Sequence, residues 1–311
     1  MKLVFCGTPD FAVPSLQALV DAGHQIALVL TQPDRPAGRK LELSIPPVKQ
    51  LALTLGLPVL QPERLKNNPD LRSTLEALAP DAIVVVAYGR IIPAWMLQLP
   101  RLGNINVHGS LLPKYRGAAP IQWAIANGET ETGVTTMLLD SGLDTGDTLL
   151  FHSLPIPPHT TSPQLYLQLS HIGANLMIQT LYGLEQGTLH PTPQDHTLAT
   201  LAPILTREDG RLDLTHRTAQ QTYNRWRGFT PWPGAHALFR CKRFLIHQMH
   251  LSSSTSGLVP NQLESSTEEL LVGAANNTLL VLDEVQLEGK PRMPGSQFAR
   301  DFQLHPGEHL A

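Results

Sequence analysis

The chain contains few cysteines, few aromatic side chains and little charge for its length. Of its 311 residues two are cysteines, 5% are aromatic and 16% are charged. Cys6 and Cys241 lie far apart and neither belongs to a Cys-x-x-Cys pair, so we expect free thiols rather than a disulfide scaffold or a zinc site. The net charge of −3 provides no global basic field, so a polyanionic partner would need a local basic patch.

Motifs of several enzyme classes are also absent. The sequence has no Gly-x-Gly-x-x-Gly fingerprint, no P-loop and no Gly-x-Ser-x-Gly nucleophile elbow. Pro9, in the turn after the first expected strand, lacks the backbone N–H that a phosphate would need. The thirteen histidines show no recognisable metal-ligand spacing. These absences favour a metal-free group transfer over redox, kinase or metallohydrolase chemistry.

The sequence predicts neither a signal peptide nor a membrane span. An apolar strand segment begins at Lys2 without the charged and hydrophobic regions of a signal peptide. No apolar run approaches the length needed to cross a bilayer. We therefore expect a soluble, cytoplasmic protein without membrane association, and we expect it to be a monomer.

Hydrophobic patterning predicts two domains. Strand and helix patterns alternate through the first half, which is typical of βαβ units with a parallel sheet. We expect a Rossmann-like α/β catalytic domain with a mostly parallel sheet over residues 1–188, a proline-bearing linker over 189–206 and a small β-barrel domain over 207–311. Expected strands cover residues 3–6, 25–30, 58–60, 82–87, 105–108, 134–139, 235–239, 244–249, 269–272 and 279–285, and expected helices cover 14–22, 47–55, 68–78, 119–127, 162–187 and 215–226.

A candidate active site lies at the end of one predicted strand. Asn106 and His108 are two residues apart, so both side chains belong to the same face of that strand. Asp144 lies between two glycines in a later loop. An amide can stabilise a developing oxyanion by about 3 kcal/mol in a dry site, and a carboxylate can orient an imidazole and favour its charged form. A histidine alone would more often be structural, but the three groups together favour acyl-group chemistry.

The loop after the second strand is locally basic. Residues 34–49 include four basic residues and two acidic residues, Asp34 and Glu42, which gives this segment a net charge of +2. Such a loop can be an ordinary solvated segment, but on the ligand side of the sheet it can bind a phosphate backbone. The basic residues of the loop are Arg35, Arg39, Lys40 and Lys49. This surface can be extended by Lys114, Arg116, Arg225, Arg227, Arg240, Lys242 and Arg243.

Several motifs identify a family. They include Asn106-Val-His-Gly-Ser-Leu-Leu-Pro113, Thr31-Gln-Pro-Asp-Arg-Pro-Ala-Gly-Arg39, Gly142-Leu-Asp-Thr-Gly-Asp147 and Arg227-Gly-Phe-Thr-Pro-Trp-Pro-Gly-Ala235. Shorter matches lie at residues 5–11, 116–122, 131–135 and 285–290. Together the motifs resemble the methionyl-tRNA formyltransferases over nearly the whole chain. The Asn-x-His…Asp set recurs across folate-dependent formyltransferases, whereas the loop after residue 31 and the C-terminal domain are more specific to the tRNA enzymes.

The resemblance implies a formyltransferase fold joined to an OB-like C-terminal barrel. It implies 10-formyltetrahydrofolate as the formyl donor, initiator methionyl-tRNA as the acceptor and no metal. In the basic loop after residue 31, the chain reads Gly38-Arg-Lys-Leu-Glu42, where family members often have Gly-Arg-Gly-Lys-Lys. The implied catalytic residues are Asn106, His108 and Asp144; the implied folate-binding residues are Ser110, Leu111, Leu112 and Pro113 with Gly89, Arg90, Ile91 and Ile92; the implied tRNA-binding residues are Arg35, Arg39 and Lys40.

Three other functions remain open at this point. The acceptor can be another amine, such as that of an amino-sugar nucleotide or a ribonucleotide. Water can replace the amine, which would make the chain a formyltetrahydrofolate hydrolase. The chain can also be a non-catalytic RNA-binding protein, although its intact Asn-x-His…Asp set argues against this. The basic loop and the C-terminal domain argue against the first two.

Overall fold

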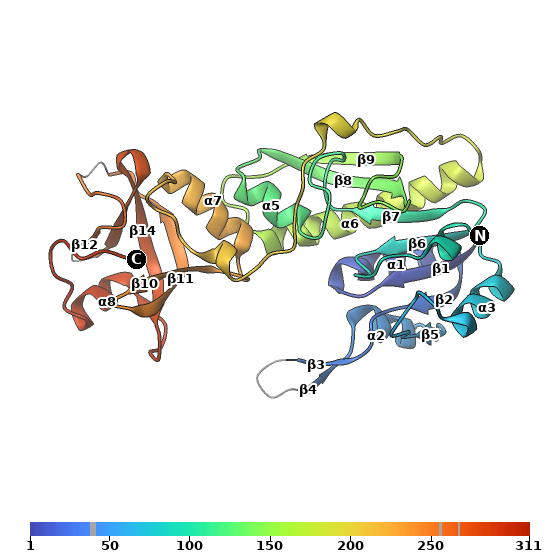
Figure 1. Cartoon of the computed structure of the whole chain (residues 1–311), viewed down its shortest axis with the longest axis horizontal. Helices are drawn as coiled ribbons and strands as arrows, with labels where there is room; N and C mark the ends of the chain where they lie inside the picture. The colour runs from blue at the N-terminus through green and yellow to red at the C-terminus, as the bar shows by residue number, and fades with distance from the viewer. Residues whose placement is uncertain (38–41, 255–256, 267) are drawn as a thin grey trace. The chain divides into compact units, whose positions relative to one another are not determined.

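The structure is a computed structural model that describes residues 1–37, 42–254, 257–266 and 268–311. These residues divide into two compact units (Figure 1). The first unit consists of residues 1–120, 131–155 and 165–203, and the second of residues 121–130, 156–164 and 204–311. Most of the segment expected to be a linker therefore belongs to the first unit.

The first unit is built on a seven-stranded sheet with the order β5-β2-β1-β6-β7-β8-β9. The strands from β5 to β7 are parallel, and β8 and β9 are antiparallel to their neighbours. This arrangement confirms the predicted mostly parallel α/β sheet. The strand bounds are β1 Lys2–Gly7, β2 Gln25–Leu30, β5 Val59–Leu60, β6 Ala82–Val86, β7 Asn104–His108, β8 Glu131–Leu138 and β9 Thr148–Pro155.

Two features of this sheet differ from the sequence-based prediction. A parallel direction was expected for β8, but β8 runs antiparallel to β7. The expected crossover helix, α5 Pro120–Ala126, belongs almost entirely to the second unit and therefore does not return the chain over the sheet. Strand β9 was not predicted, because most of its side chains are at least partly exposed and it lacks a continuous apolar run.

Helices and a hairpin complete the first unit. Helix α6 packs on the sheet so closely that a Cβ atom on Gly173 would lie 2.7 Å from Val107 Cγ1, and Figure 1 shows α6 beside β7 and β8. Asn68 caps α3 by accepting a hydrogen bond from the Leu71 N–H at 3.1 Å. The helices are α1 Val13–Asp21, α2 Pro47–Thr54, α3 Pro69–Leu78, α4 Ala94–Leu97 and α6 Ser162–Glu185, and the hairpin pairs β3 Arg35–Ala37 with β4 Glu42–Ser44.

The second unit contains an antiparallel sheet with the order β10-β11-β14-β13-β12, and β15 pairs with β14. Its core includes a cluster of phenylalanine rings, with the centroids of Phe244 and Phe298 4.8 Å apart. Helix α7 begins at Ala219 rather than at the predicted residue 215, because Thr218 and Gln221 form a capping box there. The elements are α7 Ala219–Phe229, β10 Ala235–Phe239, β11 Lys242–Leu251, β12 Leu263–Ser265, β13 Leu270–Ala274, β14 Thr278–Leu287, β15 Met293–Pro294 and α8 Gly295–Asp301.

Candidate functional site

Strand β7 holds Asn106 and His108 in the middle of the sheet. Asn106 pairs with Val85 of β6, and His108 pairs with Thr135 of β8. Because both residues follow the strand period of two, their side chains belong to one face. Asn106 is 9% exposed and His108 is 5% exposed. Within the part of the chain that the structure describes, the Asn106 amide makes no hydrogen bond, so its donors are available to a substrate.

The His108 ring lies between two acceptor groups. Its Nε2 atom is 2.9 Å from the Tyr115 carbonyl oxygen, which can only accept, so Nε2–H donates. Its Nδ1 atom is 3.6 Å from Asp144 Oδ2. That separation suits an ion pair but is too long for a hydrogen bond. With Nε2 engaged, Nδ1 is the ring nitrogen left without a hydrogen bond among the described residues.

Asp144 reaches His108 from a loop that turns back along the sheet. Strand β8 is antiparallel, so its last residue, Leu138, pairs with Ile105 at the beginning of β7. The loop between β8 and β9 must return past about three residues, or roughly 10 Å, to bring a carboxylate to His108. Asp144 adopts a left-handed backbone conformation with φ of 52°, and its Oδ2 accepts a hydrogen bond from the Gly117 N–H at 2.8 Å.

The segment Ser110–Pro113, which follows β7, is fixed by hydrogen bonds. The Ser110 hydroxyl donates to the Lys114 carbonyl at 2.6 Å. Thr135 Oγ1 donates to the Ser110 carbonyl at 2.7 Å and accepts from the Leu112 N–H at 3.2 Å. The Leu112–Pro113 peptide bond is cis. This segment begins two residues after His108, so it borders the His108 side of the candidate site.

The segment Gly89–Ile92 follows β6, whose carboxyl end is at the same edge of the sheet as that of β7. Within the described residues, the backbone N–H groups of Arg90, Ile91 and Ile92 have no hydrogen-bond partner. The Arg90 side chain is held away from them, because its Nε donates to Gln32 Oε1 at 3.1 Å. Ile91 is 92% exposed. Free amides beside an apolar side chain can hydrogen-bond the polar edge of a planar heterocyclic ligand and contact its ring face.

Of the three implied tRNA contacts, only Arg35 can be placed. Arg35 is an exposed residue of β3, whereas Arg39 and Lys40 lie outside the described residues. Lys49 is not a free cation of this loop, because its ammonium group is 2.6 Å from Asp34 Oδ2. The hydrogen bonds from Lys49 and Gln61 hold the pKa of Asp34 below its usual value. Among the described residues, the basic surface of this loop is therefore smaller than the sequence suggested.

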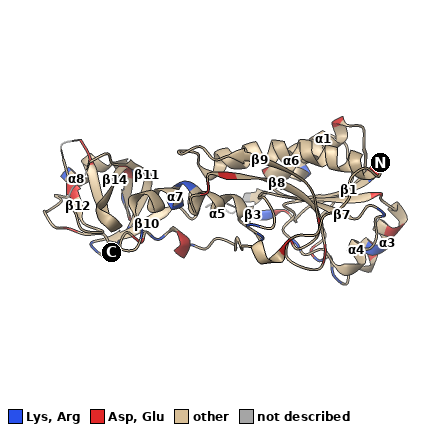
Figure 2. Ribbon diagram, turned by 90° about the horizontal axis from the view of Figure 1, so that it is seen from above, with Lys and Arg blue, Asp and Glu red and all other residues tan. Residues whose placement is uncertain are grey.

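Two of the other candidate surface cations are buried. Arg116 is 7% exposed and Arg227 is 4% exposed, so neither can contact a nucleic acid, and their assignment to a basic surface was wrong. Arg227 donates to the Thr160 carbonyl at 2.9 Å instead. In the ribbon of Figure 2, the positions of Lys and Arg (blue) and of Asp and Glu (red) occur in both units. Lys114 and Lys242 remain exposed, and Arg240 is exposed but paired with Glu308.

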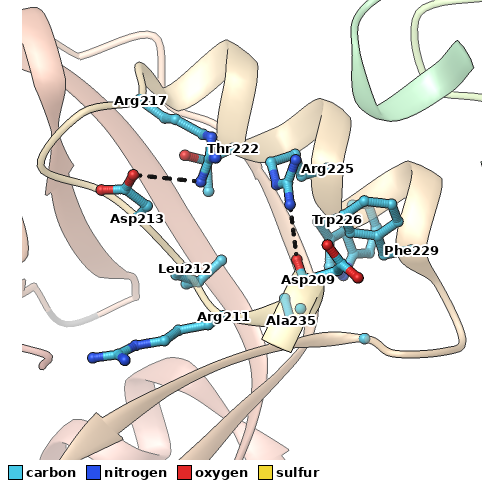
Figure 3. A pocket seen from close by; sticks show the side chains of 12 residues that line it. Asp209, Arg211, Leu212, Asp213, Arg217, Thr222, Arg225, Trp226, Phe229 and Ala235 are labelled. Atoms are coloured by element: carbon cyan, nitrogen blue, oxygen red, sulfur yellow. Dashed lines mark hydrogen bonds and ion pairs between the residues drawn. The ribbon is translucent and has the colours of Figure 1, made fainter. Parts of the chain in front are cut away.

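A separate pocket lies within the second unit, between α7 and the segment that precedes it (Figure 3). Its charged groups already have partners within the protein. Arg217 is 3.5 Å from Asp213, and Arg225 donates to the Asp209 carbonyl at 3.0 Å. The Arg225 guanidinium also lies 4.7 Å from the centroid of Phe229. Its charges are satisfied internally, so we do not assign the chemistry to it.

The sequence did not predict that residues 192–202 support the candidate site around His108 and Asp144. Gln194 donates to the Asp144 carbonyl at 2.9 Å, and the Thr200 hydroxyl accepts from the Tyr115 N–H at 2.9 Å. The polar, proline-bearing composition of this stretch is typical of a linker. Only the long-range contacts reveal that it borders the catalytic loops.

Comparison with known proteins identifies the family. Residues 1–181 match the formyl transferase family model, and residues 204–303 match the model of the formyl transferase C-terminal domain. The chain belongs to the formyl transferase family. Among curated relatives, proteins named methionyl-tRNA formyltransferase from Acidobacterium capsulatum and Koribacter versatilis are 57% and 58% identical to it over 310 residues. These alignments cover 100% of this chain and 99% and 98% of the relatives.

Solved structures of formyltransferases share the fold. An N-formyltransferase from Helicobacter canadensis in complex with folinic acid and dTDP-3-aminofucose has a TM-score of 0.68 at 18% identity, covering 91% of this chain and 98% of that one. A sugar 3N-formyltransferase with dTDP and 5-N-formyl-tetrahydrofolate has a TM-score of 0.65 at 19% identity, covering 94% and 99%. A folate co-substrate fits this family. Among the residues that the structure describes, no helix is long and apolar enough to cross a membrane.

Proposed function

We propose that this formyl transferase moves the formyl group of 10-formyltetrahydrofolate to the amino group of initiator methionyl-tRNA, giving N-formylmethionyl-tRNA. The observation that carries the proposal is the His108–Asp144 pair beside the free Asn106 amide, in a chain 57% identical to methionyl-tRNA formyltransferases over its full length. Such a reaction takes place where translation begins, so we assign the protein to the cytoplasm.

The proposed reaction exchanges one C–N bond for another. The neutral methionyl amine attacks the formyl carbon and forms the new C–N bond, and the bond from that carbon to N10 of the donor breaks. The proton lost by the amine is taken up by N10. Negative charge grows on the formyl oxygen as the amine adds, so donors directed at that oxygen lower the barrier.

Asn106 and His108 supply those donors. The Asn106 amide is unengaged among the described residues, and His108 can donate through Nδ1 because Nε2–H is held by the Tyr115 carbonyl. Asp144 stabilises the imidazolium through the ion pair at 3.6 Å and helps relay the proton from the amine. These roles make Asn106, His108 and Asp144 the proposed catalytic residues. Holding the two substrates together supplies several kcal/mol more, on the order of the effects measured for oriented intramolecular reactions.

The remaining predicted site residues are assigned to binding. Ser110, Leu111, Leu112 and Pro113 form the rigid wall beside the reaction centre, and the free amides that follow Gly89, those of Arg90, Ile91 and Ile92, suit the hydrogen-bonding edge of the pterin. We assign tRNA contact to Arg35, Arg39 and Lys40 and to the domain after residue 206. No step of the proposed chemistry requires a metal.

A panel of acceptors tests the function. The purified protein is incubated with a labelled formyl donor and either methionyl-tRNA, uncharged tRNA, a dTDP-amino sugar or no acceptor. We expect label in methionyl-tRNA alone. Label in the amino sugar would instead make the chain a sugar formyltransferase, and release of formate without any acceptor would make it a hydrolase.

A further inference from the structure

The Asp144 loop is held in place from outside by one glutamine. Gln194 is 8% exposed and lies in the stretch that the sequence predicted to be a linker. Its Nε2 donates to two carbonyl oxygens of the loop, those of Asp144 at 2.9 Å and Gly146 at 2.7 Å. Its Oε1 accepts from Arg116 Nη2 at 2.6 Å and from Arg116 Nε at 3.2 Å.

The orientation of this amide follows from its partners. Carbonyl oxygens can only accept and a guanidinium can only donate, so a flipped amide would face like groups on both sides. The two donor hydrogens and the two acceptor positions of Gln194 are all used. A buried amide that is fully satisfied in this way has one orientation and rigidifies the groups that it joins.

Arg116, the second partner of Gln194, stands between the two backbone groups that hold the catalytic pair. The carbonyl of the preceding residue, Tyr115, accepts from His108 Nε2, and the N–H of the following residue, Gly117, donates to Asp144. Gln194 therefore connects the loop that carries Asp144 to the segment that orients both His108 and Asp144. No other described side chain bonds to both the Asp144 loop and Arg116.

The stretch that carries Gln194 is itself anchored on both sides. Before it, Thr192 and Thr148 exchange backbone hydrogen bonds at 2.8 and 2.9 Å. After it, the Arg116 N–H donates to the Thr200 carbonyl at 2.9 Å, and the Ala202 N–H donates to the Arg116 carbonyl at 2.7 Å. A Cβ atom on Gly117 would lie 2.6 Å from the Ala202 carbonyl oxygen, so the contact requires glycine there.

We propose that Gln194 is a positioning residue for formyl transfer: it fixes the returned Asp144 loop against the Tyr115–Gly117 segment and thereby sets the separation between Asp144 and His108. This inference rests on the proposed function of the catalytic pair. Gln194 touches neither substrate in this account and acts only through Asp144 and Arg116. Its loss is therefore expected to change the rate of the chemical step more than the binding of either substrate.

Two substitutions distinguish the loss of all four hydrogen bonds of Gln194 from the loss of only the two that it donates to the Asp144 loop. Gln194→Met has a similar length and removes all four hydrogen bonds. Gln194→Glu keeps the acceptor for Arg116, which protects folding, but loses the donors to the two loop carbonyls. The matched controls are Gln186→Met and Gln186→Glu. Gln186 is the exposed residue that directly follows α6, and its side chain makes no hydrogen bond with a described residue.

Steady-state and single-turnover formylation of methionyl-tRNA provide the first readout. We expect kcat to fall about 10- to 100-fold in both Gln194 variants, as for other residues that orient catalytic groups. The KM values for the folate donor and for methionyl-tRNA should stay within about threefold, and both Gln186 variants should match the unaltered protein. Unchanged kcat in both Gln194 variants would overturn the inference, as would a rise in KM with kcat preserved.

A crystal structure of the Gln194→Glu protein provides a readout that does not depend on the acceptor. We expect the distance from His108 Nδ1 to Asp144 Oδ2 to exceed the 3.6 Å of the unaltered chain. An unchanged distance would overturn the inference even if activity fell. If the unaltered protein and the Gln186 controls formylate no methionyl-tRNA, the proposed function fails, and the crystallographic distance still decides the role of Gln194.

Discussion

Replacing Asp144 by asparagine removes a full negative charge from beside the His108 ring with almost no change in shape. The asparagine oxygen can still accept the hydrogen bond that the Gly117 N–H makes to Asp144 at 2.8 Å. What changes is the electrostatic support for an imidazolium at His108, so the substitution isolates the charge from the geometry of the loop.

The structure sets the size of this effect. Two unit charges 3.6 Å apart, the separation of His108 Nδ1 from Asp144 Oδ2, attract each other by about 4.6 kcal/mol at an effective dielectric constant of about 20. A neutral asparagine at this separation retains only a weak dipolar attraction, and the Asp144 side chain is 14% exposed, which screens the original pair somewhat further. We therefore expect a loss of about 2–4 kcal/mol. That loss corresponds to about a 30- to 1000-fold slower chemical step.

Single-turnover formyl transfer with enzyme in excess measures this step directly. Both substrates are saturating, and the melting temperature of the variant is compared with that of the unaltered protein. We expect a slow Asp144→Asn enzyme with a melting temperature within a few degrees of the original. An Asp144→Asn rate within threefold of the unaltered rate, together with an inactive Asp144→Ala protein, would refute the reasoning, because shape rather than charge would then be what His108 requires.

Four further predictions concern individual residues. Asn106→Ala should slow single-turnover transfer about 100-fold without loss of folding, because its amide makes no hydrogen bond with a described residue; an unchanged rate would exclude it from the oxyanion site. Arg39→Ala should raise the KM for methionyl-tRNA and reduce its salt dependence while the KM for the donor stays constant, and unchanged values would contradict the basic-loop assignment. The exposed Cys241 should react with a thiol reagent in the native protein, whereas burial raises the pKa of the Cys6 thiol, which should react only after unfolding. The hydrogen bond from the Lys2 N–H holds the pKa of Asp81 below its usual value. Asp81 therefore stabilises the fold above about pH 4, and this contribution is lost as the pH falls through the folded-state pKa. An Asp81→Asn protein should melt lower near neutral pH, and a difference that did not shrink as the pH fell below about 4 would contradict this.

Strand β7 and its neighbours were predictable because their patterns are local. Strand β6, Ala82–Val86, is buried at every position and is correspondingly apolar throughout. Asn106 and His108 break the same pattern at the end of β7, and polar residues at the end of a buried strand are a site signal that the sequence carries. The N-terminal limit of α3 was also readable, from Asn68 followed by proline.

The direction of β8 and the role of Gln194 could not be predicted, because both depend on contacts between distant segments. The segment that joins β7 to β8 contains a helix, as a parallel crossover would, but that helix packs in the other unit. Gln194 lies in a stretch rich in proline and polar residues. Its burial against Asp144 therefore produces no hydrophobic periodicity that could be recognised in the sequence. The predicted surface position of Arg116 was wrong for a related reason. Its charge suggested exposure, but its side chain is buried and donates a hydrogen bond to Gln194.

The most direct test of formyl transfer at the His108 site is the mass of the aminoacyl group after reaction. Methionyl-tRNA is incubated with the protein and 10-formyltetrahydrofolate, the tRNA is digested, and the methionyl-adenosine fragment is analysed. The account predicts a fragment carrying one formyl group on the methionyl nitrogen, formed by the unaltered protein and lost or slowed by orders of magnitude in His108→Ala. An unmodified fragment alongside consumption of the donor, or equal formylation by the His108→Ala protein, would contradict it.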